Sequence, residues 1–185
     1  HSLQVGGENN TYSLLQEFGS VLSVDVPDLL NRSTDRSRTL NDYVESLTNI
    51  TARATDKNTE LENDISRLEA DRRSASTDVN TIQRTVNAAL KDKDYATAAA
   101  EQERLSEAKS KQSKAEVDLK LTQDIRKTLQ QLLQLSTRRL RAIDENRAVL
   151  IAGLGVVEVP GIEDLDILMQ GERIRGSNGG GFFSF

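Results

Sequence analysis

Apolar and small residues recur every seven positions between residues 40 and 150, in two halves separated by a short polar run. In the first half, one row of such positions contains Leu47, Ala54, Leu61, Leu68, Ala75, Ile82 and Ala89. A second row, three residues earlier, contains Val44, Thr51, Asn58, Ile65, Arg72, Val79 and Val86. Paired rows at this spacing are typical of a helix that buries a narrow seam against another helix.

The same pattern returns after the polar run Lys91-Asp92-Lys93-Asp94. One row now contains Leu105, Gln112, Leu119, Arg126, Leu133, Leu140 and Arg147. The other contains Ala108, Ala115, Thr122, Leu129, Ser136, Ile143 and Leu150. Two seams on either side of a polar break predict an all-α fold, a long antiparallel two-helix coiled-coil hairpin that turns near residues 91–94. Short helical or irregular flanks are expected to pack at its base.

The register of this hairpin also follows from the sequence. If the chain reverses near Asp92–Lys93, facing residues have numbers with a constant sum. This places Ile82 opposite Leu105 and pairs Thr51 with Ser136, whose hydroxyl groups are able to share a hydrogen bond. Four polar residues fall on the seam and are predicted to fix the register at some cost in stability. They are Asn58, Arg72, Gln112 and Arg126.

The flanks divide the chain into three segments, 1–26, 27–152 and 153–185. The first is predicted to hold a short amphipathic helix from Thr11 to Ser23, packed on the hairpin base or on another subunit. A lipid-facing role is less favoured, because the polar face of this helix lacks lysine and arginine. Pro27 marks a boundary, and the long helix is expected to start there or to restart after Asp35.

In the third segment, Gly153 and Gly155 are expected to end the second long helix, at about Ile151. Residues 156–159 have β character, and residues 163–174 predict a second short amphipathic helix. A glycine-rich linker and an aromatic end follow. We interpret the apolar residues of the two flanks as candidate interaction residues: Phe182, Phe183, Phe185, Leu14, Leu15, Phe18, Leu165 and Leu168.

The turn region carries a local family resemblance. Asp94-Tyr95-Ala96-Thr97-Ala98-Ala99, followed by Glu103 and Leu105, resembles the UVR-type helical hairpin over about residues 84–106. Gln102 stands where that motif usually has an arginine. The resemblance implies a tight helix–turn–helix that closes on Tyr95 and two alanines. Hairpins of that family bind partner proteins, a function that we do not transfer to this chain.

Composition narrows the possible functions. Hydrophobic residues make up 36% and aromatic residues 4% of the 185 residues, which suits a narrow seam better than a broad globular core. The chain has no cysteine, which excludes thiolate sites and a cysteine nucleophile, and its one histidine is His1. We see no apolar run that is long enough to span a membrane and no signal peptide.

No group of residues predicts a catalytic, cofactor or metal site. The acids Glu158, Glu163, Asp164 and Asp166 lack the spacing of a calcium loop. The basic residues between Arg126 and Arg147 have no aromatic neighbours for base stacking, and the net charge of −5 argues against nucleic acid. We expect these arginines to pair with acids of the first helix instead.

The sequence therefore predicts a non-enzymatic structural, assembly or protein-interaction module, acting as a homo-oligomer or with another protein. One alternative is a component of a cell-surface appendage, a secretion system or an envelope adaptor complex. The composition fits an extracellular or envelope location slightly better than a cytoplasmic one. A further alternative is a nucleic-acid-binding arm, which steep salt dependence of binding would reveal.

Overall fold

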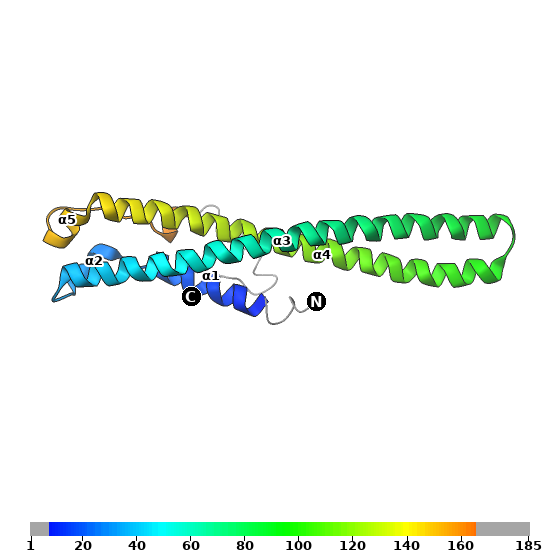
Figure 1. Ribbon diagram of the computed structural model, residues 1–185, viewed down its shortest axis with the longest axis horizontal. Coiled ribbons are helices and arrows are strands. Elements are labelled where there is room, and N and C mark those ends of the chain that lie inside the picture. Colours follow the sequence, from blue (N-terminus) through cyan, green and yellow to red (C-terminus); the bar gives the residue numbers. More distant parts are fainter. Residues whose placement is uncertain (1–7, 166–185) are drawn as a thin grey trace. The chain divides into compact units, whose positions relative to one another are not determined.

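The computed structural model describes residues 8–165, which form helices joined by short turns (Figure 1). Its longest elements are α3 (Arg36–Lys91) and α4 (Tyr95–Glu145). The shorter elements are α1 (Glu8–Leu22), α2 (Val26–Asn31), α5 (Arg147–Ala152) and the 3-10 helix η2 (Ile162–Leu165). No strand occurs within this range. The prediction of an all-α helical hairpin is confirmed.

The chain divides into two compact units. Unit 1 contains the described residues up to Asn58 and from Lys127 onward, and unit 2 is Thr59–Arg126. Both units contain part of α3 and part of α4, and unit 1 also contains α1, α2, α5 and η2. The N-terminal helix therefore shares a unit with the base of the hairpin.

Unit 2 is a two-helix hairpin around a narrow seam. Its buried apolar side chains are Leu61, Leu68, Ile82, Val86, Ala89, Ala98, Leu105, Ala108, Leu119 and Ile125. Ile82, Val86, Leu105 and Ala108 form one cluster, with Val79 packed against it. This is the register expected from the heptad rows.

Polar side chains interrupt the seam of unit 2 in pairs. The Gln112 amide donates to the Ser76 hydroxyl at 3.0 Å, and the Arg126 guanidinium binds the Glu62 carboxylate at 2.9 Å. Arg72 departs from the prediction, because its side chain is exposed. A guanidinium buried without an acceptor would lose its hydration without compensation, so a long side chain at a seam edge extends into water. The fourth polar position, Asn58, belongs to unit 1 and is half-buried.

The turn of unit 2 ends α3 with a Schellman motif. The Lys93 amide donates to the Leu90 carbonyl at 3.1 Å, and the Asp94 amide donates to the Ala89 carbonyl at 2.8 Å. This motif requires a left-handed residue, and Lys93 occupies that position with φ of 59°. The carboxylate of Asp94 then caps α4 by accepting from the Thr97 amide at 3.2 Å. Its hydrogen bonds with Thr97 hold the pKa of Asp94 below its usual value.

The expectation from the UVR-type resemblance is only partly correct. The turn is tight and Ala98 is buried, but Ala99 is exposed and Tyr95 is 64% exposed. Tyr95 therefore does not cover the turn. The reason is the heptad register: the seam positions of early α4 continue the row of Leu105 back to Ala98, and position 95 lies outside that row.

Replacing Lys93 with glycine is expected to stabilise the protein by about 1 kcal/mol, since a left-handed conformation costs a non-glycine residue about that much. Denaturant unfolding would measure the change. The control is Asp92→Gly, one position earlier, where φ is not positive. Glycine at that site is expected to give no gain in stability, and an equal gain from both variants would contradict the explanation.

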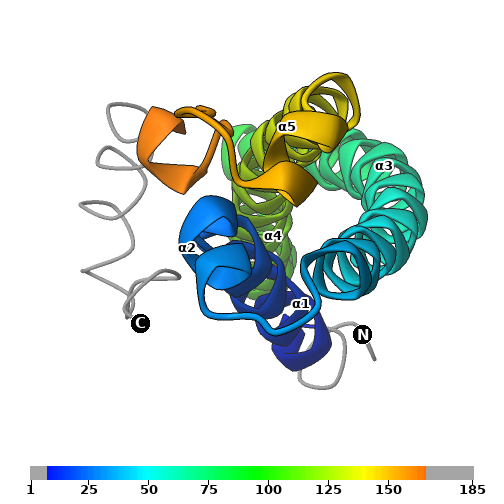
Figure 2. The same cartoon turned by 90° about the vertical axis from the view of Figure 1, so that its left-hand side faces the viewer.

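Unit 1 has a wider core than unit 2, because α1 lies against α3 and α4 (Figures 1 and 2). The buried apolar residues that α1 and α2 contribute are Leu14, Leu15, Phe18, Leu22, Val26 and Leu30. The predicted short helix is thus present, although it begins at Glu8 rather than near Thr11. The predicted pair is also confirmed, since the hydroxyl oxygens of Thr51 and Ser136 lie 2.6 Å apart.

The heptad positions explain why the two units differ. In unit 1, positions outside the two seam rows are also buried, namely Tyr43, Ile50, Thr128, Leu132, Leu135 and Arg139. One or more heptads away in unit 2, most positions of the same rows are charged: Asp64, Asp71, Asp78, Arg104, Glu107, Lys111, Lys114 and Asp118. A third helix therefore finds an apolar face only on unit 1.

A helix begins near each of the two positions that were predicted as starts of the first long helix. Asp25 caps α2, with Pro27 in its first turn, and Asp35 accepts from the Arg38 amide at the start of α3. The second long helix ends earlier than predicted, because α4 stops at Glu145 and α5 follows. Asn146 separates the two helices because its backbone departs from helical values, with φ of −111° and ψ of 16°. Its side-chain amide donates to the Ala142 carbonyl at 2.8 Å, beside the backbone bond to the same carbonyl.

The C-terminal end of α5 is held by Arg36. Its guanidinium donates to the carbonyls of Leu150, at 2.7 Å, and Ile151, at 3.0 Å. Gly153 follows in the left-handed conformation, with φ of 68°. A Cβ atom there would lie 3.2 Å from the Arg36 guanidinium carbon, so glycine satisfies both the conformation and the close approach.

Candidate functional site

Arg139 is the most unusual side chain of unit 1, because it is a cation in the core. It is only 2% exposed, and it lies one heptad after the buried Leu132 in α4. Its Nη1 donates to the Leu22 carbonyl at 2.7 Å, and its Nη2 donates to the Val24 carbonyl. Burial lowers the pKa of this guanidinium, which two carbonyl oxygens bind in place of a carboxylate.

Tyr43 accompanies Arg139 from the opposite helix. Its hydroxyl donates to the Val21 carbonyl at 2.6 Å, and the guanidinium carbon of Arg139 lies 5.5 Å from the centre of its ring. At this distance the cation is attracted to the ring face. The two side chains thus bind three carbonyls at the end of α1.

This arrangement supplies what α1 lacks by itself. The last carbonyls of a helix have no partner within the helix, and they carry a partial negative charge. The last turn of α1 contains no basic residue. Arg139 and Tyr43 therefore act as its C-terminal cap and fix where α1 ends on unit 1. Arg53 adds an exposed ion pair with Glu17 at 2.9 Å, a contact that contributes little to stability.

Burial raises the pKa of Tyr43 to about 12. The positive charge of Arg139 lowers this pKa, but its effect is the smaller of the two. An unfolded chain releases this proton near pH 10, so the contribution of Tyr43 is complete below pH 10 and is lost as the pH rises to about 12. We expect the free energy of unfolding to fall by about 2 kcal/mol over this window. Denaturant titrations at several pH values would show a smaller fall in Tyr43→Phe, and an identical fall would contradict this assignment.

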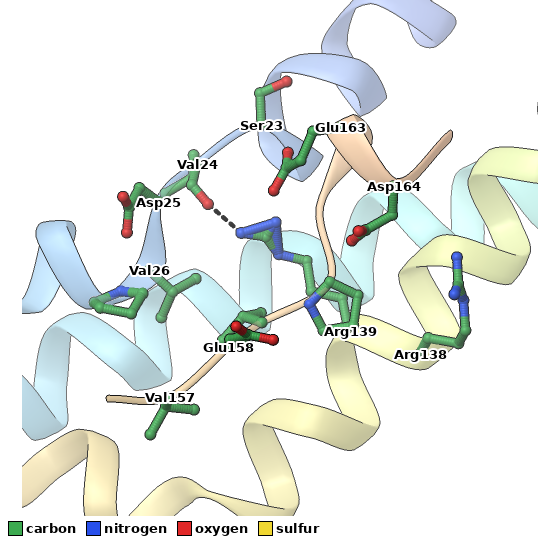
Figure 3. Close-up of a pocket in the computed structure, with 13 residues that line it drawn as sticks. Ser23, Val24, Asp25, Val26, Arg138, Arg139, Val157, Glu158, Glu163 and Asp164 are labelled. Atoms are coloured by element: carbon green, nitrogen blue, oxygen red, sulfur yellow. Dashed lines mark hydrogen bonds between the residues drawn. The ribbon is translucent and has the colours of Figure 1, made fainter. Parts of the chain in front are cut away.

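A cleft of about 770 Å³ opens beside Arg139 (Figure 3). Its walls come from the segment between α1 and α2 with the start of α2, from α4, and from the segment between α5 and η2 with η2 itself. The lining residues are Ser23, Val24, Asp25, Val26, Pro27, Arg138, Arg139, Val157, Glu158, Val159, Pro160, Glu163 and Asp164. Four of these are carboxylates that are exposed to solvent, whereas Arg139 is buried. The open part of the cleft is therefore acidic.

Three polar side chains of this cleft are engaged in hydrogen bonds with the backbone. Its hydroxyl group, on Ser23, donates to the Gly19 carbonyl at 2.7 Å. Two of its carboxylates accept backbone amides, Asp25 from Asp28 at 3.1 Å and Asp164 from Gly161 at 2.8 Å. Within residues 8–165, no group of three or more histidine, aspartate or glutamate residues is placed to hold a metal ion.

The structure places the predicted interaction residues in two classes. Leu14, Leu15, Phe18 and Leu165 are buried in unit 1, where they form part of its core. Leu168 and the three phenylalanines of the C-terminal end lie outside the described residues. The described part of the predicted second flank helix is the 3-10 turn η2, and residues 156–159 form no strand.

The basic stretch of α4 is distributed among different roles. Arg126 pairs with Glu62, as expected, and Arg139 caps α1. Arg138 and Arg141 are exposed. Sequence reasoning missed the role of Arg139, although its position carried a signal: it continues a row that is apolar at Leu132. The two preceding positions of this row, Ile125 and Leu132, are buried, which indicates that Arg139 also faces the core.

Comparison of the chain with protein-family models, with curated proteins and with solved structures gave no match. In the described range, no helix has both the length and the apolar character needed to cross a lipid bilayer.

Proposed function

We propose that this chain is a structural or assembly module that binds protein partners and has no enzymatic activity. The observation that supports this is where its exposed large apolar side chains lie. They form two groups, one at the turn of unit 2 and one around the end of α5 in unit 1. The first group is Leu90 and Tyr95, 49% and 64% exposed, and the second is Val149, Leu154 and Val156, 40%, 68% and 96% exposed.

The grouping carries the argument, because single exposed apolar residues are common on protein surfaces. Elsewhere in the described chain, Val117 is the one large apolar residue of this kind. Burying a valine or leucine against a partner is worth about 1.5–3 kcal/mol. Apolar side chains gathered at helix ends are therefore suited to contacts between molecules, whereas the charged outer faces of the helices favour solvent.

The test is the mass of the full chain in solution, measured by light scattering over a range of concentrations. We expect a multiple of 20.5 kDa. Leu154→Ser combined with Val156→Ser, or Leu90→Ser combined with Tyr95→Ser, is expected to shift the mass toward the monomer. Val117→Ser is the matched control and is expected to leave it unchanged. A full chain that stays at 20.5 kDa throughout would contradict self-assembly and restrict the proposal to a heterologous partner.

A further inference from the structure

The segment 156–160, between α5 and η2, has the character of a strand that has no strand partner among the described residues. It has no regular secondary structure, and no backbone hydrogen bond joins it to another segment in the part of the chain that the structure describes. Its side chains alternate, since Val157 and Val159 are half-buried whereas Val156 and Glu158 are exposed. This period of two is that of a strand. The segment therefore presents backbone donors and acceptors along an edge.

Residues 157–160 of this segment form one side of the cleft beside Arg139. Figure 3 shows the segment at Val157 and Glu158. The cleft has apolar lining, contributed by valines and prolines of two segments. Its carboxylates are Asp25, Glu158, Glu163 and Asp164. The one exposed cation in the lining is Arg138, because Arg139 is buried and bound to carbonyls. An occupant of this cleft therefore meets a backbone edge that is unpaired within residues 8–165, apolar contacts and an excess of negative charge.

We propose that the cleft binds an extended segment of a partner protein in which basic and β-branched side chains alternate. The backbone of that segment pairs with residues 157–159 as an added strand, which supplies affinity. Its basic side chains lie on the carboxylates, and the charge complementarity supplies selectivity. This inference rests on the proposed function as a protein-binding module, and it specifies the chemistry of one partner.

The first test is binding of a synthetic peptide, Arg-Val-Arg-Val-Arg with blocked ends, to the full chain by titration calorimetry. The same peptide with N-methylated valines keeps its charge but loses two backbone donors, and we expect at least tenfold weaker binding. A peptide with glutamate in place of arginine is expected not to bind. Equal affinity of the plain and N-methylated peptides would overturn backbone pairing.

The second test changes the protein. Glu158→Lys combined with Glu163→Lys reverses two carboxylates of the cleft, neither of which accepts a hydrogen bond in the described structure. We expect at least tenfold weaker peptide binding from this variant. Glu103→Lys combined with Glu116→Lys makes the same change in net charge on exposed positions of unit 2. This control is expected to bind the peptide within about twofold of the original chain, since exposed charges outside the cleft lining are screened by salt.

The remaining outcomes are decisive as well. Equal loss in both double variants would mean non-specific attraction and would overturn the site. Arg173 and Arg175 lie outside the described residues. If the peptide binds only after both are changed to alanine, the occupant of the cleft is the chain's own segment, and this result would overturn a foreign partner. Absence of binding in every case would overturn the inference, and the mass measurement would still test assembly separately.

Discussion

Replacing Arg139 with methionine is expected to destabilise unit 1 by about 3 kcal/mol or more. Methionine keeps most of the apolar stem but has no donor, so the carbonyls of Leu22 and Val24 lose their partners. Each orphaned buried acceptor costs about 1–3 kcal/mol. Replacing a buried ion pair with apolar residues is often harmless, but here the acceptors are backbone carbonyls that remain in place.

Denaturant unfolding would measure the loss, and hydrogen exchange would locate it. We expect the amides of α1 to exchange faster in Arg139→Met, because the helix has lost its C-terminal cap. Arg138→Met is the matched control, since Arg138 is the exposed neighbour, and a change within about 0.5 kcal/mol is expected there. Similar losses in the two variants would mean that Arg139 does not act as a cap.

The second large effect is expected from Ile50→Asp. Ile50 is 2% exposed and lies between Tyr43 and Arg53, both of which bind α1. The substitution removes a buried apolar side chain and places a carboxylate in the core of unit 1. We expect a loss of about 4 kcal/mol or more in the free energy of unfolding.

Thr85→Asp is the matched control for Ile50→Asp, because it introduces the same residue at the same heptad position of α3. Thr85 is exposed in unit 2, where this row is polar. The expected change is within about 0.5 kcal/mol. Comparable losses at both positions would show that the row is covered in both units, contrary to the structure.

The seam was predictable because it is a local pattern. A seven-residue period requires only the residues of one helix, and the constant sum then fixed the pairs that the structure shows, such as Thr51 with Ser136. The exposure of Arg72 was not predictable from the period, because a long polar side chain at a seam position is able to reach water. The period also predicted a helix that continues past Asn146, whereas the backbone leaves the α-helical conformation at that residue.

The cleft could not be predicted, because its walls come from three segments that are distant in sequence. Arg139 sits in a run of arginines that resembles a surface patch, and its acceptors lie more than a hundred residues earlier, at Leu22 and Val24. The docking of α1 left a clearer trace. In the rows that contain Tyr43 and Leu132, the buried apolar residues Tyr43, Ile50 and Leu132 lie toward the base, and most positions toward the turn are charged. This difference locates the face that a third helix covers.

The register of the hairpin also orders the loops that close as the chain folds. The hydrogen bond between Ser76 and Gln112 spans 36 residues, the pair of Glu62 with Arg126 spans 64, and the cap of α1 by Arg139 spans 117. Because closure entropy grows with loop length, contacts near the turn form at low cost, as does the bond of Tyr43 to Val21, which spans 22 residues and joins α1 to α3. The contact of α1 with α4 through Arg139 forms at the highest cost of these. During synthesis, α1 is made 117 residues before the arginine that caps it. The side of α1 that faces α4 therefore stays uncovered until Arg139 has left the ribosome, whereas α3 is able to cover the other side earlier.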